Sequence, residues 1–167
     1  MPANISEEAA MEEVLERTEI LVRTMAQRDL ADIVRIDSIS FGHARPRYFE
    51  VLLERSVQVT GLQISLVAEL DGRIVGFLVA SLYYGEYGIA EPTASIDAVG
   101  VEPELRRKGV GRALMQQFRS NVAALGVTKV RTEVEWTDFD LLGFLAREGF
   151  SPAKRLCLES SIDPTKT

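Results

Sequence analysis

The sequence predicts an α+β fold, with a mixed, mostly antiparallel sheet of six or seven strands flanked by about four helices. An Asp71-Gly72 turn joins two runs rich in Val, Ile and Leu, which is typical of an antiparallel hairpin. A strand-like segment, 93–101, leads through two glycines into an amphipathic helix, and a further strand, 129–136, follows. Strand, helix and strand in this order predict a right-handed β-α-β crossover, so one pair of strands is parallel.

Each predicted element rests on a local pattern. Strands are predicted where apolar residues alternate or run together between turn residues, at 18–24, 63–70, 73–84, 93–101, 129–136 and 154–162. Helices are predicted where apolar residues recur at helical spacing: from the N-cap Asp29 to the break at Phe41-Gly42, around 48–53, from Gly109 to about Leu125, and from Asp138 to Arg147 or Glu148. Along 129–136, alternation places Glu133 and Glu135 on the same strand face, opposite Val130, Thr132, Val134 and Trp136.

Length and composition limit the class of protein. The 167 residues, 46% hydrophobic and 26% charged, fit one globular domain at 18–167, preceded by an acidic N-terminal extension, 1–17, that is helical or mobile. A net charge of −6 argues against nucleic-acid binding, which a basic stripe would indicate. No apolar run reaches the roughly 18 residues of a membrane span, and the acidic N-terminus lacks the basic start and apolar stretch of a secretory signal.

Cysteine and histidine are scarce in this chain. The single cysteine, Cys157, excludes an internal disulfide and fits the reducing cytoplasm, where we expect the protein to act. We expect Cys157 to be a small buried hydrophobe rather than a nucleophile. Because His43 is the only histidine, we expect no metal site, and we expect His43 itself on the surface.

The most informative segment is the turn Arg106-Arg-Lys-Gly-Val-Gly111, between the strand 93–101 and the helix that follows it. Closely spaced backbone N–H groups at a helix start, with three cations beside them, can hold a phosphate or pyrophosphate. A dinucleotide-binding turn would need a third glycine at position 114, where leucine stands. A Walker-type loop would need a Gly-Lys-Ser/Thr sequence, which this chain lacks.

The pattern Arg106-x-x-Gly109-x-Gly111, preceded by Val99-x-Val101-x-Pro103, resembles the acyl-CoA signature of the GNAT superfamily of N-acetyltransferases. The order of elements over 18–162 is similar to that family as well, which implies a GNAT-like sheet. The resemblance implies acetyl-CoA as cosubstrate, with its pantetheine arm against the main chain of Val99, Gly100 and Val101. It also implies that the pyrophosphate is bound by the turn made of Arg106, Arg107, Lys108, Gly109, Val110, Gly111 and Arg112.

A candidate catalytic residue comes from the run Thr132-Glu-Val-Glu-Trp-Thr-Asp138. This run is similar to the Leu-Glu-Val-Arg-x-Ser-Asn run of the GNAT branch that acetylates the N-termini of ribosomal proteins. The resemblance places Glu133 on the catalytic Glu of that branch, as the base that takes a proton from the attacking amine. Glu135 and Asp97 remain alternative bases, and a solvated charge is the alternative role for Glu133.

The sequence departs from the family at the usual proton donor. Many members carry Asn-x-x-Ala-x-x-x-Tyr before a terminal Gly-Phe, and counting back from Gly149-Phe150 puts Asp138 and Leu145 at the Asn and Tyr positions. Leucine donates no proton, although a thiol with a pKa of about 8.5 leaves as a thiolate without one. Alternative donors, each more typical of packing, are Tyr83, Tyr84 and Tyr87.

Three functions are consistent with these expectations. The leading one is an enzyme, an acetyl-CoA-dependent N-acetyltransferase, which moves an acetyl group to the primary amine of a small molecule or protein by direct attack. The second is an acyl-CoA-binding regulatory domain with little or no catalysis, which Asp138 and Leu145 favour. The third is an interaction module that binds no CoA. We expect no nucleic-acid or membrane partner, and a homodimer is compatible with the resemblance.

Overall fold

The computed structural model describes residues 19–60, 64–85 and 90–165, with the backbone alone for 55–60. The chain divides into two compact units, Met1–Glu133 and Val134–Thr167, which we describe separately. The predicted N-terminal extension, residues 1–17, lies outside the described residues.

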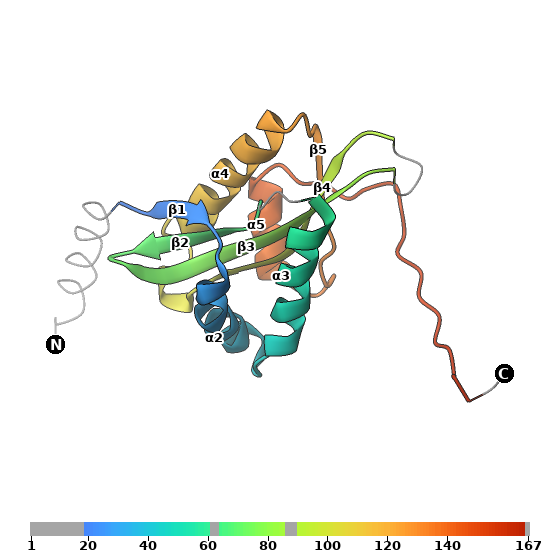
Figure 1. Ribbon diagram of the computed structural model, residues 1–167, viewed down its shortest axis with the longest axis horizontal. Coiled ribbons are helices and arrows are strands. Elements are labelled where there is room, and N and C mark those ends of the chain that lie inside the picture. Colours follow the sequence, from blue (N-terminus) through green and yellow to red (C-terminus); the bar gives the residue numbers. More distant parts are fainter. Residues whose placement is uncertain (1–18, 61–63, 86–89, 166–167) are drawn as a thin grey trace. The chain divides into compact units, whose positions relative to one another are not determined.

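The first unit is built on one sheet of five strands in the order β1-β2-β3-β4-β5 (Figure 1). The three pairings from β1 to β4 are antiparallel, and β4 pairs with β5 in parallel through the crossover helix α4 (Val110–Ala124). The strands are β1 (Leu21–Thr24), β2 (Leu66–Leu70), β3 (Arg73–Tyr83), β4 (Thr93–Val101) and β5 (Lys129–Thr132). The predicted α+β class, the hairpin and the crossover are confirmed, but the described sheet has five strands instead of six or seven.

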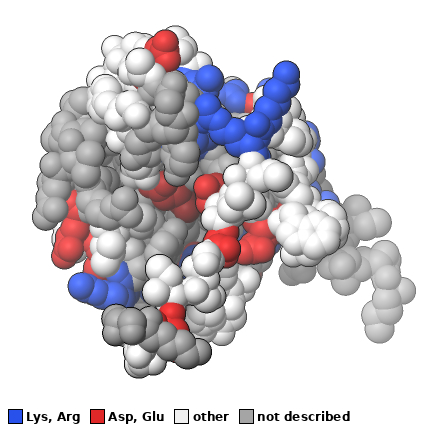
Figure 2. Space-filling view, turned by 90° about the vertical axis from the view of Figure 1, so that its right-hand side faces the viewer, with Lys and Arg blue, Asp and Glu red and all other residues white. Residues whose placement is uncertain are grey.

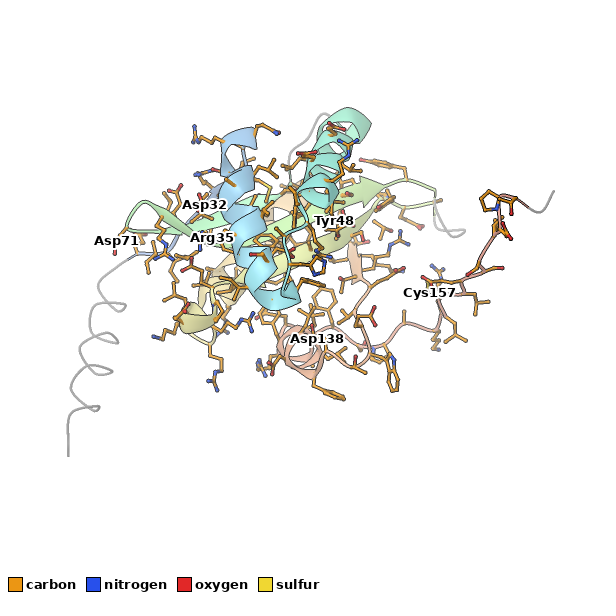
Figure 3. All side chains as sticks on the ribbon, turned by 90° about the horizontal axis from the view of Figure 1, so that it is seen from below. Asp32, Arg35, Tyr48, Asp71, Asp138 and Cys157 are labelled. Carbon is orange, nitrogen blue, oxygen red and sulfur yellow. The ribbon has the colours of Figure 1, made fainter. Side chains whose placement is uncertain are left out.

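The strand predicted at 154–162 is wrong. These residues adopt no regular structure in the second unit, and Leu156, Leu158 and Ile162 are 87–88% exposed. Alternation of apolar residues makes a strand only where a neighbouring strand satisfies its backbone groups, and no ladder includes this segment in the part of the chain that the structure describes. Cys157 lies in it and is exposed (Figure 3), which corrects the expectation of a buried thiol.

The predicted helices are present, with corrected bounds. Helix α2 (Leu30–Phe41) ends at Gly42, whose φ of 74° is the left-handed conformation that glycine favours. Helix α3 (Pro46–Thr60) is much longer than the predicted 48–53, because no glycine or proline interrupts it between Pro46 and Gly61. Short 3₁₀ turns precede α2 (η1, Gln27–Asp29) and follow β4 (η3, Pro103–Leu105), and the second unit contains α5 (Phe139–Arg147).

The two faces of the sheet carry different helices (Figure 1). On one face, Phe49 of α3 packs edge-on against Phe77 of β3, with ring centroids 5.5 Å apart, in a core to which α2 also contributes. On the other face, Gly76 lets α4 approach closely: a Cβ there would lie 2.9 Å from a methyl group of Val110. A Cβ on Gly100, opposite Phe77 in the ladder, would lie 2.5 Å from the Phe77 ring.

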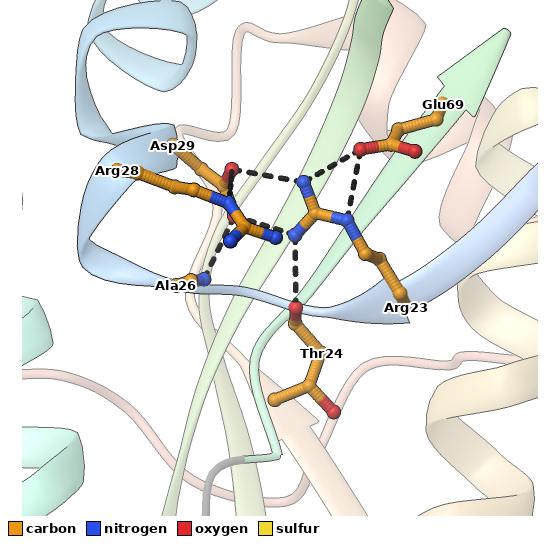
Figure 4. Close-up of polar contacts among 6 residues, drawn as sticks. All are labelled: Arg23, Thr24, Ala26, Arg28, Asp29 and Glu69. Carbon is orange, nitrogen blue, oxygen red and sulfur yellow. Dashed lines mark hydrogen bonds and ion pairs between the residues drawn. The ribbon is translucent and has the colours of Figure 1, made fainter. Parts of the chain in front are cut away.

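Asp29 does not cap α2 through its side chain, contrary to the prediction. Its carboxylate instead accepts hydrogen bonds from the backbone N–H of Ala26, at 2.7 Å, and from the Arg23 guanidinium, at 2.7 and 2.9 Å (Figure 4). Arg23 also donates to Glu69 of β2. The hydrogen bonds from Arg23 hold the pKa of Asp29 below its ordinary value although burial opposes this, so the ion pair fixes the chain between β1 and α2.

Candidate functional site

Strands β4 and β5 pair for only four positions and then separate. Their parallel register runs from Thr93 opposite Lys129 to Ile96 opposite Thr132, where β5 ends. β4 continues to Val101, bound to β3 on one side. On the other side, residues 97–101 pair with no strand in the described ranges, so this length of backbone can bind an extended ligand as an added strand would.

The separation coincides with a β-bulge at Asp97. Val79 pairs with Ala98 and Ala80 pairs with Ile96, which leaves Asp97 as the extra residue of β4. Its carboxylate accepts a hydrogen bond of 2.6 Å from Ser81. Its backbone carbonyl accepts one of 3.2 Å from the Tyr48 hydroxyl of α3, and burial raises the pKa of that hydroxyl above its ordinary value. Asp97 is therefore held on the α2/α3 side of the sheet.

Beyond β4, Glu102 anchors the chain before the glycine turn. It is 4% exposed, and its N–H donates to the carbonyl of Val75. Its carboxylate accepts hydrogen bonds from Arg73 and from Arg35 of α2. Burial acts to raise the pKa of Glu102, but the hydrogen bonds and charges of the two arginines outweigh it, and the pKa lies below the ordinary value. A charged Glu102, bonded to two arginines and to the backbone of β3, fixes where the turn begins.

The turn itself presents backbone donors at the start of α4. Arg107 and Gly109 adopt positive φ values of 62° and 90°, and Gly109 is the N-cap of the helix. The hydrogen bond from Ala113 N–H to the Gly109 carbonyl closes the first helical turn. The N–H groups of Val110, Gly111 and Arg112 come before it, where a helix has no acceptor of its own to offer them. This end of α4 suits an anionic group such as a phosphate.

The predicted phosphate-binding cations do not all behave alike. The side chains of Arg107, Lys108 and Arg112 are exposed on the turn. Arg106 is exposed as well, but its side chain is hydrogen-bonded within the protein: its Nε donates to the Val101 carbonyl at 3.3 Å and its Nη2 donates to the Ser40 hydroxyl of α2 at 2.8 Å. The structure thus brings the predicted cofactor residues 99–101 and 106–112 together at one end of β4. One of them, Arg106, is hydrogen-bonded to helix α2.

Glu133 is the first residue after β5, and it is exposed. The predicted strand 129–136 is too long, because pairing stops at Thr132 where β4 moves away. Glu133 and Glu135 therefore do not share a strand face as predicted. Asp97 and Glu133 are the first residues after the last pair, one on each diverging chain, so both candidate bases lie beside the separation.

The second unit is described by itself. Asp138 caps α5, since its carboxylate accepts a hydrogen bond of 3.0 Å from the Leu141 N–H, as the sequence predicted. Leu145, at the position of the usual proton donor, is 4% exposed. Trp136, predicted to share a strand face with Val130, Thr132 and Val134, lies after the end of the strand and is 81% exposed.

Other kinds of site find little support among the described residues. Within 19–60, 64–85 and 90–165, no three His, Cys, Asp or Glu residues are arranged to hold a metal ion. His43 is exposed, with Nδ1 3.1 Å from the Phe41 carbonyl. No described helix is both long and apolar enough to cross a membrane. Figure 2 shows both acidic and basic side chains on the face it draws, so that face carries charge of both signs.

Comparison with known proteins fits this geometry. A family model described as Acetyltransferase (GNAT) family matches residues 30–150. The fold is similar to that of Ard1 from Thermoplasma volcanium, at 26% identity and a TM-score of 0.67, over 79% of this chain and 82% of that chain. It is similar to a ribosomal-protein-alanine N-acetyltransferase from Brucella melitensis biovar Abortus 2308, at 16% identity and a TM-score of 0.67, over 87% of this chain and 100% of that chain.

A further similar structure is the aminoglycoside N-acetyltransferase AAC(6')-Iy in complex with CoA, at 18% identity and a TM-score of 0.72, over 86% of this chain and 95% of that chain. The family match extends from α2 to the end of α5 and includes the open edge of β4 and the glycine turn. The chain therefore belongs to the acetyltransferase (GNAT) family.

Proposed function

We propose that this protein transfers the acetyl group of acetyl-CoA to a primary amine of a small molecule or protein. The observation that carries the proposal is the open edge of β4, residues 97–101, beside the open N-terminus of α4. An extended amide-bearing chain fits the first and a pyrophosphate fits the second, and CoA carries both groups in one molecule. A cytoplasmic setting is part of the proposal, because the chain has one cysteine only.

The donor set suits acetyl-CoA. The main chain of Val99, Gly100 and Val101 would pair with the amides of the pantetheine arm. The N–H groups at the start of α4, with the cations Arg107, Lys108 and Arg112 beside them, would hold the pyrophosphate. When bound there, acetyl-CoA supplies an acetyl thioester that an amine can attack. CoA bound to a relative, AAC(6')-Iy, supports this part of the proposal.

The contribution of the protein is to hold the amine and accept its proton. An amine attacks only when neutral, and near pH 7.5 an α-amine with a pKa of about 7.7–8.0 is neutral roughly a third of the time, against about one part in a thousand for a lysine near 10.4. We assign the base to Glu133, directly or through a water, because it is the first residue beyond the β4–β5 pairing. Asp97, at the corresponding point of β4, and Glu135 are the alternatives.

A second function, binding of acyl-CoA for regulation with little or no catalysis, is favoured by one observation. Leu145 stands where many members of the family carry a tyrosine, and leucine cannot protonate a leaving thiolate. A thiol pKa near 8.5 permits departure without that proton, so we retain acetyl transfer as the leading function.

The experiment has two parts. Calorimetric titration of the full chain with CoA tests binding, and incubation with acetyl-CoA and a panel of amines, followed by release of free CoA thiol, tests transfer. The panel contains peptides with free α-amines, lysine side chains, polyamines and aminoglycosides. Binding with turnover supports the proposal. Binding without turnover on any amine supports the regulatory function, and failure to bind CoA overturns both.

A further inference from the structure

Arg106 connects the glycine turn to a helix that is distant in sequence. Its Nε donates to the carbonyl of Val101, the last residue of β4, and its Nη2 donates to the hydroxyl of Ser40, 66 residues earlier in the chain. Because the backbone of Arg106 begins the turn, one side chain joins the end of β4, the turn and the last helical turn of α2. The neighbouring cations Arg107 and Lys108 are exposed on the turn.

Ser40 belongs to a well-braced corner between α2 and α3. The guanidinium of Arg45 pairs with the buried carboxylate of Asp37, at 2.7 and 2.9 Å, and lies 3.6 Å from the centre of the Phe41 ring. Gly42 closes α2 by donating to the Ser38 carbonyl at 2.8 Å. Ser40 is itself exposed, but these contacts hold the chain on both sides of it, so a bond to Ser40 connects Arg106 to a rigid part of the structure.

The same corner also contacts the point where β4 and β5 separate. The Tyr48 ring lies 4.7 Å from the Arg45 guanidinium, and its hydroxyl donates to the carbonyl of Asp97. Contacts therefore run from the turn through Arg106 and Ser40 to the corner, and from the corner through Tyr48 back to β4. A closed path of this kind is a physical route by which the shape of the turn depends on α2.

We propose that Arg106 is a positioning residue, which holds the glycine turn in its ligand-binding shape by bonding it to Ser40, rather than a phosphate ligand. The inference rests on the proposed function, since it concerns affinity for CoA. A turn held in shape beforehand loses less conformational freedom on binding and so binds more tightly. The planar guanidinium can donate to two acceptors at once, here Val101 and Ser40. A lysine at this position would keep the positive charge but not this two-pronged arrangement of donors.

Calorimetric titration of the full chain with CoA tests the inference in Arg106→Lys, Arg106→Ala, Ser40→Ala and the double variant with both alanines. We expect the three single variants each to weaken CoA binding by about three- to tenfold, the scale of one typical intramolecular hydrogen bond. The double variant should bind no more weakly than the weaker single variant, because both changes remove the same bond. Ser38→Ala is the matched control: its hydroxyl bonds within α2, to the Arg35 carbonyl, and its CoA affinity should stay at the wild-type value.

Three results would overturn the inference. One is wild-type CoA affinity in Ser40→Ala. Another is wild-type affinity in Arg106→Lys with a loss in Arg106→Ala, which makes Arg106 a direct charge partner of the phosphate. The third is a loss that disappears as salt is raised, since screening weakens an exposed phosphate contact much more than a bond to a neutral hydroxyl. If the wild-type protein binds no CoA, the proposed function itself has failed, and the inference with it. Circular dichroism melts of each variant separate loss of fold from loss of affinity.

Discussion

The hydroxyl of Thr132 donates a hydrogen bond to the backbone carbonyl of Ile96 across 2.9 Å, at the last pair that β4 and β5 make. Past this bond the two chains separate, with the bulge residue Asp97 on one and Glu133 on the other. A side-chain bond thus closes the parallel ladder where its backbone bonds end. The point of separation is therefore fixed by a specific contact, and it sets where the open edge of β4 begins.

The catalytic assignment is tested by Glu133→Gln, which keeps size and hydrogen bonding but removes the basic carboxylate. We expect turnover to fall on the order of 10²-fold with CoA affinity unchanged, as for loss of a general base. The fall should be larger for a lysine-type acceptor than for an α-amine, because a smaller fraction of the lysine is neutral. Release of CoA thiol measures the turnover.

Asp97→Asn and Glu135→Gln are the companion variants, since each removes one competing carboxylate. Near-normal turnover in Glu133→Gln with severe loss in either companion would move the base to that other residue. Full turnover in all three variants would mean that the enzyme uses amine that is already neutral and needs no carboxylate base.

Gly109→Leu tests the placement of the pyrophosphate. A side chain at this N-cap obstructs approach to the first N–H groups of α4, so CoA affinity should fall at least about tenfold, a loss of roughly 1.4 kcal/mol. Gly126→Leu is the matched control: its φ of 75°, just after the other end of α4, brings similar backbone strain away from the turn. Calorimetry measures affinity, and a folded Gly109→Leu protein that binds CoA normally would refute the placement.

Leu145→Ala tests whether position 145 acts only through packing. Because Leu145 is buried, its truncation should lower the free energy of unfolding by about 2–5 kcal/mol, while turnover per folded molecule is unchanged. Leu142→Ala, at a position of α5 that is 37% exposed, should cost less. Denaturant titration and thiol-release assays measure the two quantities. A large loss of turnover at normal stability would show that the position has a chemical role.

Because of the ion pair between Arg23 and Asp29, the free energy of unfolding should depend on pH in the acid range. A carboxyl whose pKa is depressed by folding stabilises the native state above its unfolded pKa, near 3.9, and loses this contribution as the pH falls through the folded value. Asp29→Asn should lower the free energy of unfolding at pH 7 by about 1–3 kcal/mol and reduce its decline below pH 4. Urea titrations at pH 7 and pH 3 measure both effects. An unchanged decline below pH 4 would mean that other carboxyls cause it, and Asp32→Asn, whose side chain is 44% exposed, is the control.

Local patterns predicted much of this fold. The Asp71-Gly72 hairpin, the crossover at Gly109 and the cap at Asp138 depend on residues within a few positions of one another, and all three are present. The end of β5 could not be predicted in this way. Alternation continues to Trp136, but pairing ends at Thr132 because a different strand moves away.

In the candidate site, too, the features that depend on neighbouring residues were predicted, and those that depend on residues far apart in the chain were not. The sequence identified the donors of the glycine turn, which are backbone groups at a helix start, but gave no sign that Arg106 reaches Ser40, 66 residues away. It also gave no sign of the bulge at Asp97, which depends on the register of β4 against β3. The alternation of apolar residues over 154–162 is compatible with a strand. A strand forms only next to another strand, however, and the local sequence does not say whether one is available.

The contact between Phe77 and Gly100 means that the size of the side chain at one position limits the size that fits at the other. An added methyl at 100 would meet a ring that is 1% exposed and already packed against Phe49, so the protein can accept it only if position 77 becomes smaller. A search for second-site suppressors of Gly100→Ala should therefore return substitutions at 77, such as leucine. In diverging copies of this gene, changes in the core beneath α3 and in the open edge of β4 would be inherited together.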